Sequence, residues 1–178
     1  MKPVVKQTKK WLEDIVIKHN FCPFAKKELL RDSIRFYVID SSDMAEALQA
    51  LVDEFFYLDN HTETETTLVI LPNGFNQFDD YLDLVALANA LLEDQEYSGI
   101  YQLASFHPDY CFEGTDNDDP ANYTNRSPYP TLHIIRETSL ARAIASHPDV
   151  AGIPEQNIAY ARKLGRDKLQ SDLDLIRN

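Results

Sequence analysis

The stretch Ala104–Glu137, ASFHPDYCFEGTDNDDPANYTNRSPYPTLHIIRE, decides how the fold is completed. It reads as a strand, a polar loop of about 25 residues and a second strand, and a loop of that length is usually functional or disordered. Disordered segments are poor in aromatic residues, whereas this one contains Phe106, Tyr110, Phe112, Tyr123 and Tyr129. We therefore expect an ordered loop that carries functional residues.

Strand and helix patterns alternate before this stretch. Segments 33–40, 66–71 and 100–106 are predicted strands, because they are rich in β-branched and aromatic residues. Amphipathic stretches between them predict two helices. Ser41, Ser42 and Asp43 supply the N-cap of the first, which ends near Leu58, and Asp79 or Asp80 caps the second, which ends near Glu93. Such crossovers make the first three strands parallel. A fourth strand, 131–137, is expected to return antiparallel beside one of them.

Further helices are predicted on both sides of this unit: residues 4–20, a turn over 26–31, a helix to Ser146 capped by Thr138 or Ser139, and 154–164. The fold class is therefore α/β or α+β, as one three-layer domain over residues 1–165 with a mixed sheet of about four strands. Residues 166–178 form a C-terminal tail, helical or frayed, with Leu169, Leu173 and Ile176 at helical spacing.

The composition excludes several classes of function. The 178 residues carry a net charge of −12, which disfavours nucleic-acid binding through a broad basic face. No apolar run approaches the roughly 18 residues that cross a bilayer, and Glu13 and Asp14 interrupt any signal-peptide core. Two distant cysteines fit a reducing compartment, so we expect a cytoplasmic protein without membrane or nucleic-acid partners.

Loops should converge at one edge of the sheet. Ligands of open α/β sheets bind outside the carboxyl ends of the parallel strands. Those ends carry Asp40-Ser41-Ser42, Pro72-Asn73-Gly74 and Ser105-Phe106-His107, and the fourth strand starts there at Pro130-Thr131. Asn73, His107, Arg126 and His133 are therefore expected to share one rim.

Several side chains are candidates for chemistry. His107 is the natural proton carrier near neutral pH, or it caps a strand end; His133, set among Leu132, Ile134 and Ile135, is a second catalytic candidate or a satisfied core histidine. Arg126, with Asn125, Ser127 and Asn73, can bind an anionic substrate. The alternative for Arg126 is an internal clamp on Asp116, Asp118 or Asp119.

Cys22 is a candidate nucleophile, because a thiol at a helix N-terminus near Lys26 and Lys27 can be acidified. The run Asp116-Asn117-Asp118-Asp119 matches only the opening of a calcium-binding loop, and the spacing of His107 and Cys111 is not diagnostic of zinc. We predict no metal site, and the sequence identifies no cofactor.

The chain resembles a bacterial family that is known only as a domain of unknown function. The resemblance is carried by Cys22 to Ala25, by Ala104 to Pro108, and by Asn125 to His133 with Arg136 and Glu137. It implies a bacterial cytoplasmic protein and assigns no catalytic roles.

Three functions agree with these residues. The leading hypothesis is a small-molecule enzyme for an anionic substrate, in which Arg126, Asn125 and Ser127 bind the anion, His107 moves protons and Cys22 is an outside candidate for the nucleophile. The alternatives are a non-catalytic ligand-binding module and a protein-interaction protein. The residues alone leave open whether the protein is an enzyme and what its oligomeric state is.

Overall fold

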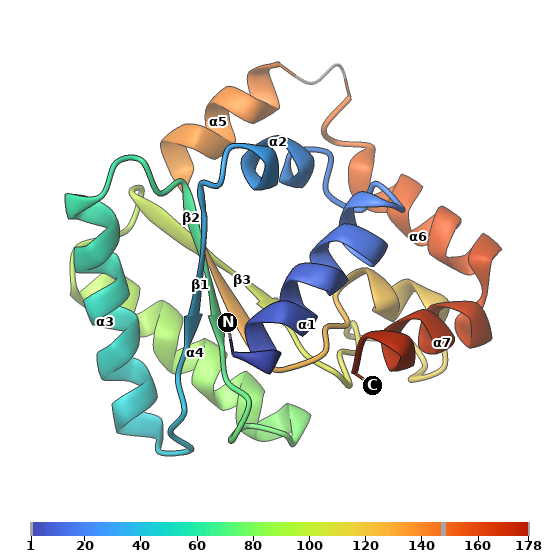
Figure 1. Cartoon of the computed structure of the whole chain (residues 1–178), viewed down its shortest axis with the longest axis horizontal. Helices are drawn as coiled ribbons and strands as arrows, with labels where there is room; N and C mark the ends of the chain where they lie inside the picture. Colours follow the sequence, from blue (N-terminus) through green and yellow to red (C-terminus); the bar gives the residue numbers. More distant parts are fainter. Residues whose placement is uncertain (1, 147–148, 178) are drawn as a thin grey trace.

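Four strands form one mixed sheet between two layers of helices in the computed structural model, which describes residues 2–146 and 149–177 (Figure 1). The strands are β1 (Ile34–Val38), β2 (Thr66–Ile70), β3 (Tyr101–Phe106) and β4 (Thr131–Arg136), in the order β1-β2-β4-β3. β1 and β2 pair in parallel, and β4 pairs antiparallel with both β2 and β3. The α/β class and the antiparallel return of the last strand are confirmed.

The last strand, β4, was expected beside one of the first three strands, and it lies between two of them, β2 and β3. β3 therefore runs in the direction of β1 and β2 without pairing with either. A central strand is covered on both faces and by two neighbours, and the burial of Leu132 and Ile134 agrees with that place. The connection between β2 and β3 therefore passes over β4.

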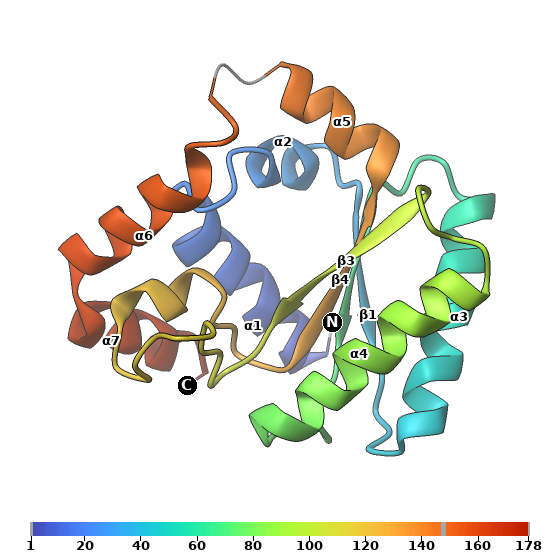
Figure 2. The same cartoon turned by 180° about the vertical axis from the view of Figure 1, so that it is seen from behind.

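Helices α3 (Met44–Asn60) and α4 (Phe78–Asp94) cover one face of the sheet (Figure 2). Asp43 caps α3 as predicted, because its carboxylate accepts a hydrogen bond from the backbone of Glu46 at 2.9 Å. The predicted cap of α4 at Asp79 or Asp80 is wrong. That helix starts at Phe78, and both carboxylates lie in its first turn, where the helix dipole favours negative charge.

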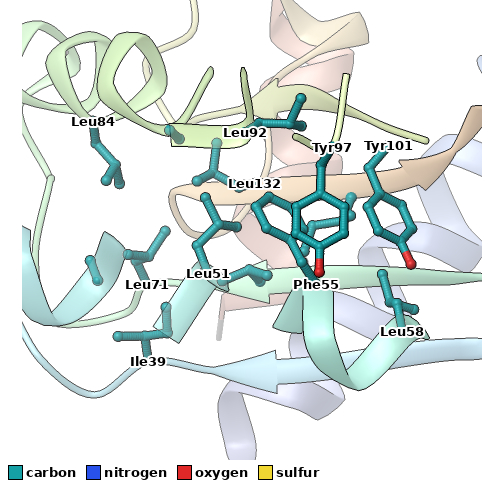
Figure 3. Packing of buried hydrophobic residues seen from close by; sticks show 14 of the residues in the cluster. Ile39, Leu51, Phe55, Leu58, Leu71, Leu84, Leu92, Tyr97, Tyr101 and Leu132 are labelled. Atoms are coloured by element: carbon teal, nitrogen blue, oxygen red, sulfur yellow. The ribbon is translucent and has the colours of Figure 1, made fainter. Parts of the chain in front are cut away.

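The core on this face is largely aliphatic with an aromatic centre. Phe55 of α3 stacks on Tyr101 of β3, with ring centroids 5.7 Å apart, and contacts Tyr97 at 4.9 Å (Figure 3). Inward residues of β2 and β4 complete it at alternate positions: Val69, Leu132 and Ile134. The other positions of these strands therefore face the opposite layer.

The opposite layer begins with α1 (Pro3–Trp11), which continues as a π-helical segment, η1 (Leu12–Ile17), followed by α2 (Ala25–Leu30). The helix predicted over residues 4–20 is therefore shorter than expected and changes its hydrogen-bonding pattern at Leu12. Trp11 is buried, and its ring meets Phe106 edge-on at 5.2 Å. This contact fixes the first helix on the sheet.

The remaining helices are the 3-10 helix η2 (Pro120–Thr124) within the long loop (residues 107–130), α5 (Glu137–Ala145), α6 (Ile153–Leu164) and α7 (Arg166–Arg177). The predicted cap of α5 at Thr138 or Ser139 is wrong, because α5 follows β4 directly at Glu137. Pro154 lies in the first turn of α6, as expected. α7 is helical and buries Leu169, Leu173 and Ile176 in the cluster around Trp11.

The predicted convergence of loops at the carboxyl edge of the sheet is confirmed by the strand register. Val38 pairs with Ile70, and Thr131 pairs with both Ile70 and Phe106. The loops after β1 and β2 are in direct contact, since a Cβ on Gly74 would lie 2.8 Å from the Cα of Ser42. This edge is closely packed.

In the described residues, no helix is long and apolar enough to span a bilayer.

Candidate functional site

His107 is fully buried at the start of the long loop, and both of its ring nitrogens are engaged. Nδ1 accepts a hydrogen bond from the backbone N–H of Asp109 at 3.0 Å, so the ring proton is on Nε2, which donates to the carbonyl of Phe75 at 2.9 Å. The rings of Phe78 and Tyr81 flank it at about 5 Å. Burial lowers the pKa of His107, so the ring is held neutral.

Arg126 acts inside the long loop. Its Nε donates to the carbonyl of Tyr110 at 3.1 Å and its Nη2 donates to that of Asn117 at 2.9 Å. The guanidinium also lies over the ring of Tyr123, 4.4 Å from the centroid. Arg126 is therefore an internal clamp, but it holds backbone carbonyls rather than the expected aspartates.

The aspartates of the loop pair elsewhere. Asp119 bonds the guanidinium of Arg162 on α6 at 2.7 Å, and Asp118 lies 3.2 Å from Arg166 on α7. The Arg162 guanidinium lowers the pKa of the Asp119 carboxyl. In the described residues, no group of three or more His, Cys, Asp or Glu side chains is placed to hold a metal ion.

The other predicted substrate-binding residues also hold the backbone. Asn125 donates to the carbonyl of Ser105 at 3.1 Å, Ser127 to that of Tyr129 at 2.6 Å, and Asn73 to that of Asp40 at 3.0 Å. Asn122 is fully buried and accepts hydrogen bonds from the backbone of Phe112 and the hydroxyl of Thr115, both at 3.0 Å. Substrate binding by Asn73, Asn125 and Ser127 stays a prediction.

A cavity of about 160 Å³, here called the sheet pocket, lies on the other face of the sheet. Thr66 and Leu68 of β2 and His133 and Ile135 of β4 form its floor, and residues of α1, η1, α2 and α5 line the rest. Figures 1 and 2 show these helices on the face of the sheet opposite α3 and α4. Apolar side chains make most of the lining: Trp11, Leu12, Val16, Leu68, Phe106, Ile135 and Leu140. Cys22, Glu28, Glu65 and His133 add polar groups.

His133 faces the sheet pocket from the middle of β4, paired with Leu68 and Ala104. The hydroxyl of Thr66 donates to the carbonyl of Ile134 at 2.5 Å, so its oxygen accepts from Nε2–H of His133 at 2.6 Å. Burial lowers the pKa of His133 to about 4. The ring is therefore neutral at pH 7, with a lone pair on Nδ1 to which none of the described residues donates.

The expectation that both histidines share one rim is wrong. His107 packs against Tyr81 of α4, whereas His133 projects from the opposite face of the sheet toward Phe106 and the sheet pocket. Side chains alternate along a strand, so Thr131 and His133 face this side while Leu132 and Ile134 face α3 and α4. The two histidines therefore lie on opposite faces of the sheet.

Cys22 lines the same pocket as His133. Backbone hydrogen bonds from Phe24 and Ala25 lower the pKa of its thiol, but burial outweighs them and the net shift is upward. Lys26 and Lys27 are exposed. The expectation of an acidified thiol is therefore wrong, and Cys22 is a protonated thiol at neutral pH.

Sequence reasoning did not find Glu65, which lines the pocket at the start of β2. Among the described residues none forms a hydrogen bond with its buried Oε1, and Arg142 lies 4.0 Å away. Arg136, also in the lining, is occupied: Nε donates to Thr64 and Nη2 to Leu58 and His61. One glutamate before a predicted strand gives no sign of this environment in the sequence.

The mixed sheet, the two helical layers and the partly open cavity define a three-layer α/β protein with a pocket of small-molecule size. The chain belongs to the family described as Protein of unknown function (DUF1415), whose sequence model matches residues 3–171. No curated protein and no solved structure matches the chain.

Proposed function

We propose that this protein is a small-molecule-binding module and that its ligand occupies the sheet pocket. The observation that carries the proposal is a partly open, mainly apolar cavity of about 160 Å³ with unused hydrogen-bond acceptors among its lining residues. Binding sites for small molecules are typically apolar cavities with a few polar groups that orient the ligand. The proposal therefore selects the second of the functions expected from the sequence.

The state of the titratable groups favours binding over catalysis. Burial lowers the pKa of both His107 and His133 and raises that of Cys22, so each is neutral at pH 7. A general base or nucleophile is usually tuned in the opposite direction, toward the operating pH or toward the thiolate. His107 and Arg126, which the enzyme hypothesis assigns to catalysis and anion binding, are engaged with the backbone.

Entry to the pocket is proposed beside α5. Ser139, Leu140 and Ala143 of this helix line the cavity, yet none of the residues of α5 is buried. Displacing such a helix exposes little apolar surface, and elements of low local stability are those that open for ligands.

Two free thiols, Cys22 and Cys111, fit a reducing compartment, and we propose that the protein is located in the cytoplasm.

Titration with indole and benzene, followed by protein NMR, tests the proposal. We expect saturable shifts of pocket residues in the wild type. Ala143→Trp fills the cavity from α5 and should abolish them, whereas Ala141→Trp, on the exposed side of the same helix, should leave them unchanged. Absence of binding to the wild type, or equal binding to both variants, would refute the proposal.

A further inference from the structure

We propose that the ligand of the sheet pocket is a compact amine with one ring or a branched aliphatic body, whose ammonium group bonds Glu65 and Nδ1 of His133. This inference rests on the proposed function and adds the chemical class of the ligand. It follows from the size of the cavity, the sign of its charges and the unused acceptors in its wall.

The volume of the sheet pocket limits the size of the ligand's apolar part. A cavity of about 150 Å³ lined by aliphatic and aromatic side chains holds one benzene molecule, and the sheet pocket measures about 160 Å³. Trp11, Leu68, Phe106 and Ile135 supply a similar lining. One ring, or an aliphatic group of the same bulk, fills this space.

The charged side chains that line the pocket disfavour an anionic ligand. Two carboxylates, Glu28 and Glu65, line the pocket. The only lining cation among the described residues is Arg136, and it donates to the carbonyls of Thr64, Leu58 and His61 and to the hydroxyl of Tyr101. An anionic ligand would lie beside carboxylates without a free donor, which disfavours the anionic substrate expected from the sequence.

The two carboxylates differ in their hydrogen-bond partners. Glu28 accepts a hydrogen bond from the hydroxyl of Ser33 at 2.8 Å, and the Arg31 guanidinium lies 3.7 Å from it. Oε1 of Glu65 is buried and accepts a hydrogen bond from none of the described residues; the nearest cation, the exposed Arg142 guanidinium, lies 4.0 Å away, beyond hydrogen-bond distance. A buried acceptor without a hydrogen bond destabilises the protein. A hydrogen-bond donor of the ligand therefore stabilises the complex more at Glu65 than at Glu28.

His133 supplies the second acceptor. Its Nε2–H is committed to Thr66, which leaves Nδ1, the other nitrogen of this pocket-lining ring, as an acceptor. An ammonium group has three donors and no acceptor, and it matches a wall that offers a carboxylate oxygen and a neutral imidazole nitrogen. A hydroxyl has one donor, so it satisfies only one of the two groups.

Three probes of one shape test the inference by calorimetry: benzylamine, benzyl alcohol and benzoate. We expect the wild type to bind benzylamine at least 10-fold more tightly than benzyl alcohol, because a charge-assisted hydrogen bond is about twice as strong as a neutral one, and to bind benzoate most weakly. Glu65→Gln should remove the preference for benzylamine and keep the affinity for benzyl alcohol. Glu63→Gln is the matched control, because Glu63 is exposed and outside the pocket lining.

The outcomes separate this inference from the proposed function. If none of the probes binds the wild type, both fail. If benzyl alcohol or benzoate binds as tightly as benzylamine, or if Glu65→Gln keeps the wild-type preference, the amine class is overturned while ligand binding stands. If Glu65→Gln does not fold, the order of the three affinities in the wild type decides the question alone.

Discussion

His107 and Arg126 show that side chains suited to binding a ligand can instead hold the protein's own backbone. A buried neutral imidazole donates from one nitrogen and accepts at the other, which suits two backbone groups at fixed positions. The fork of Arg126 spans the carbonyls of Tyr110 and Asn117 in the same way that it would span an anion. Residue type therefore indicates hydrogen-bonding capacity, and the surroundings decide how it is used.

Replacing His107 tests its structural role. His107→Ala removes the partner of the Phe75 carbonyl and of the Asp109 N–H and leaves a cavity in place of a fully buried ring, so we expect a loss of about 2–4 kcal/mol in the free energy of unfolding. His107→Asn can still accept from Asp109 and should lose less. Urea denaturation measures both values, and a neutral effect of His107→Ala would contradict the assigned role.

At the scale of elements, the apolar residues that recur at helical spacing in α7 form the face that packs against the rest of the molecule. Leu169, Leu173 and Ile176 recur at helical spacing, and all of them are buried in the cluster around Trp11. The sequence indicates the stripe but not its partner, because α1 lies more than 150 positions away in the sequence, where Gln7 bonds Arg177 (|i−j| = 170). The start of α5 and the π-helical turn of η1 escaped prediction, since each depends on packing.

Two leucines of α7 test this packing with matched chemistry. Leu173 is 2% exposed and Leu175 is 64% exposed. Leu173→Ala should reduce the free energy of unfolding by about 2–5 kcal/mol, because it leaves a cavity in the core. Leu175→Ala should change it by less than about 0.5 kcal/mol. Similar values for the two variants in urea denaturation would show that Leu173 of α7 does not stabilise the cluster around Trp11.

At the scale of the molecule, the class of fold could be predicted because strand and helix periods alternate clearly before Phe106. The strand order could not be predicted, because an apolar segment such as 131–137 fits either edge or the centre of the sheet. The pairing of β4 with both β2 and β3 decides between these places, and it joins segments that are distant in the sequence. The sheet pocket was equally hidden. It depends on His133 facing away from His107, and Cys22 and Glu65 reach it from distant parts of the chain.

The whole molecule should lose stability as the pH falls from 6.5 toward 4. The pKa of His133 is about 4 in the folded protein and about 6.5 in an unfolded chain. Between these values the unfolded chain binds a proton that the folded protein does not, so the free energy of unfolding decreases with falling pH, by on the order of 3 kcal/mol in total. His19 and His107 have pKa values lowered by burial and act with the same sign.

Two controls separate this effect from the net charge of −12. Surface repulsion is screened by 0.5 M salt, whereas the protonation of a buried group is not, so the loss should persist at high salt. His133→Gln keeps a donor for Thr66 and cannot titrate, so its stability should depend less steeply on pH between 6.5 and 5 than that of the wild type. Equal slopes in urea denaturation would mean that His133 accepts a proton in the folded state, and the neutral acceptor in the sheet pocket would be lost with it.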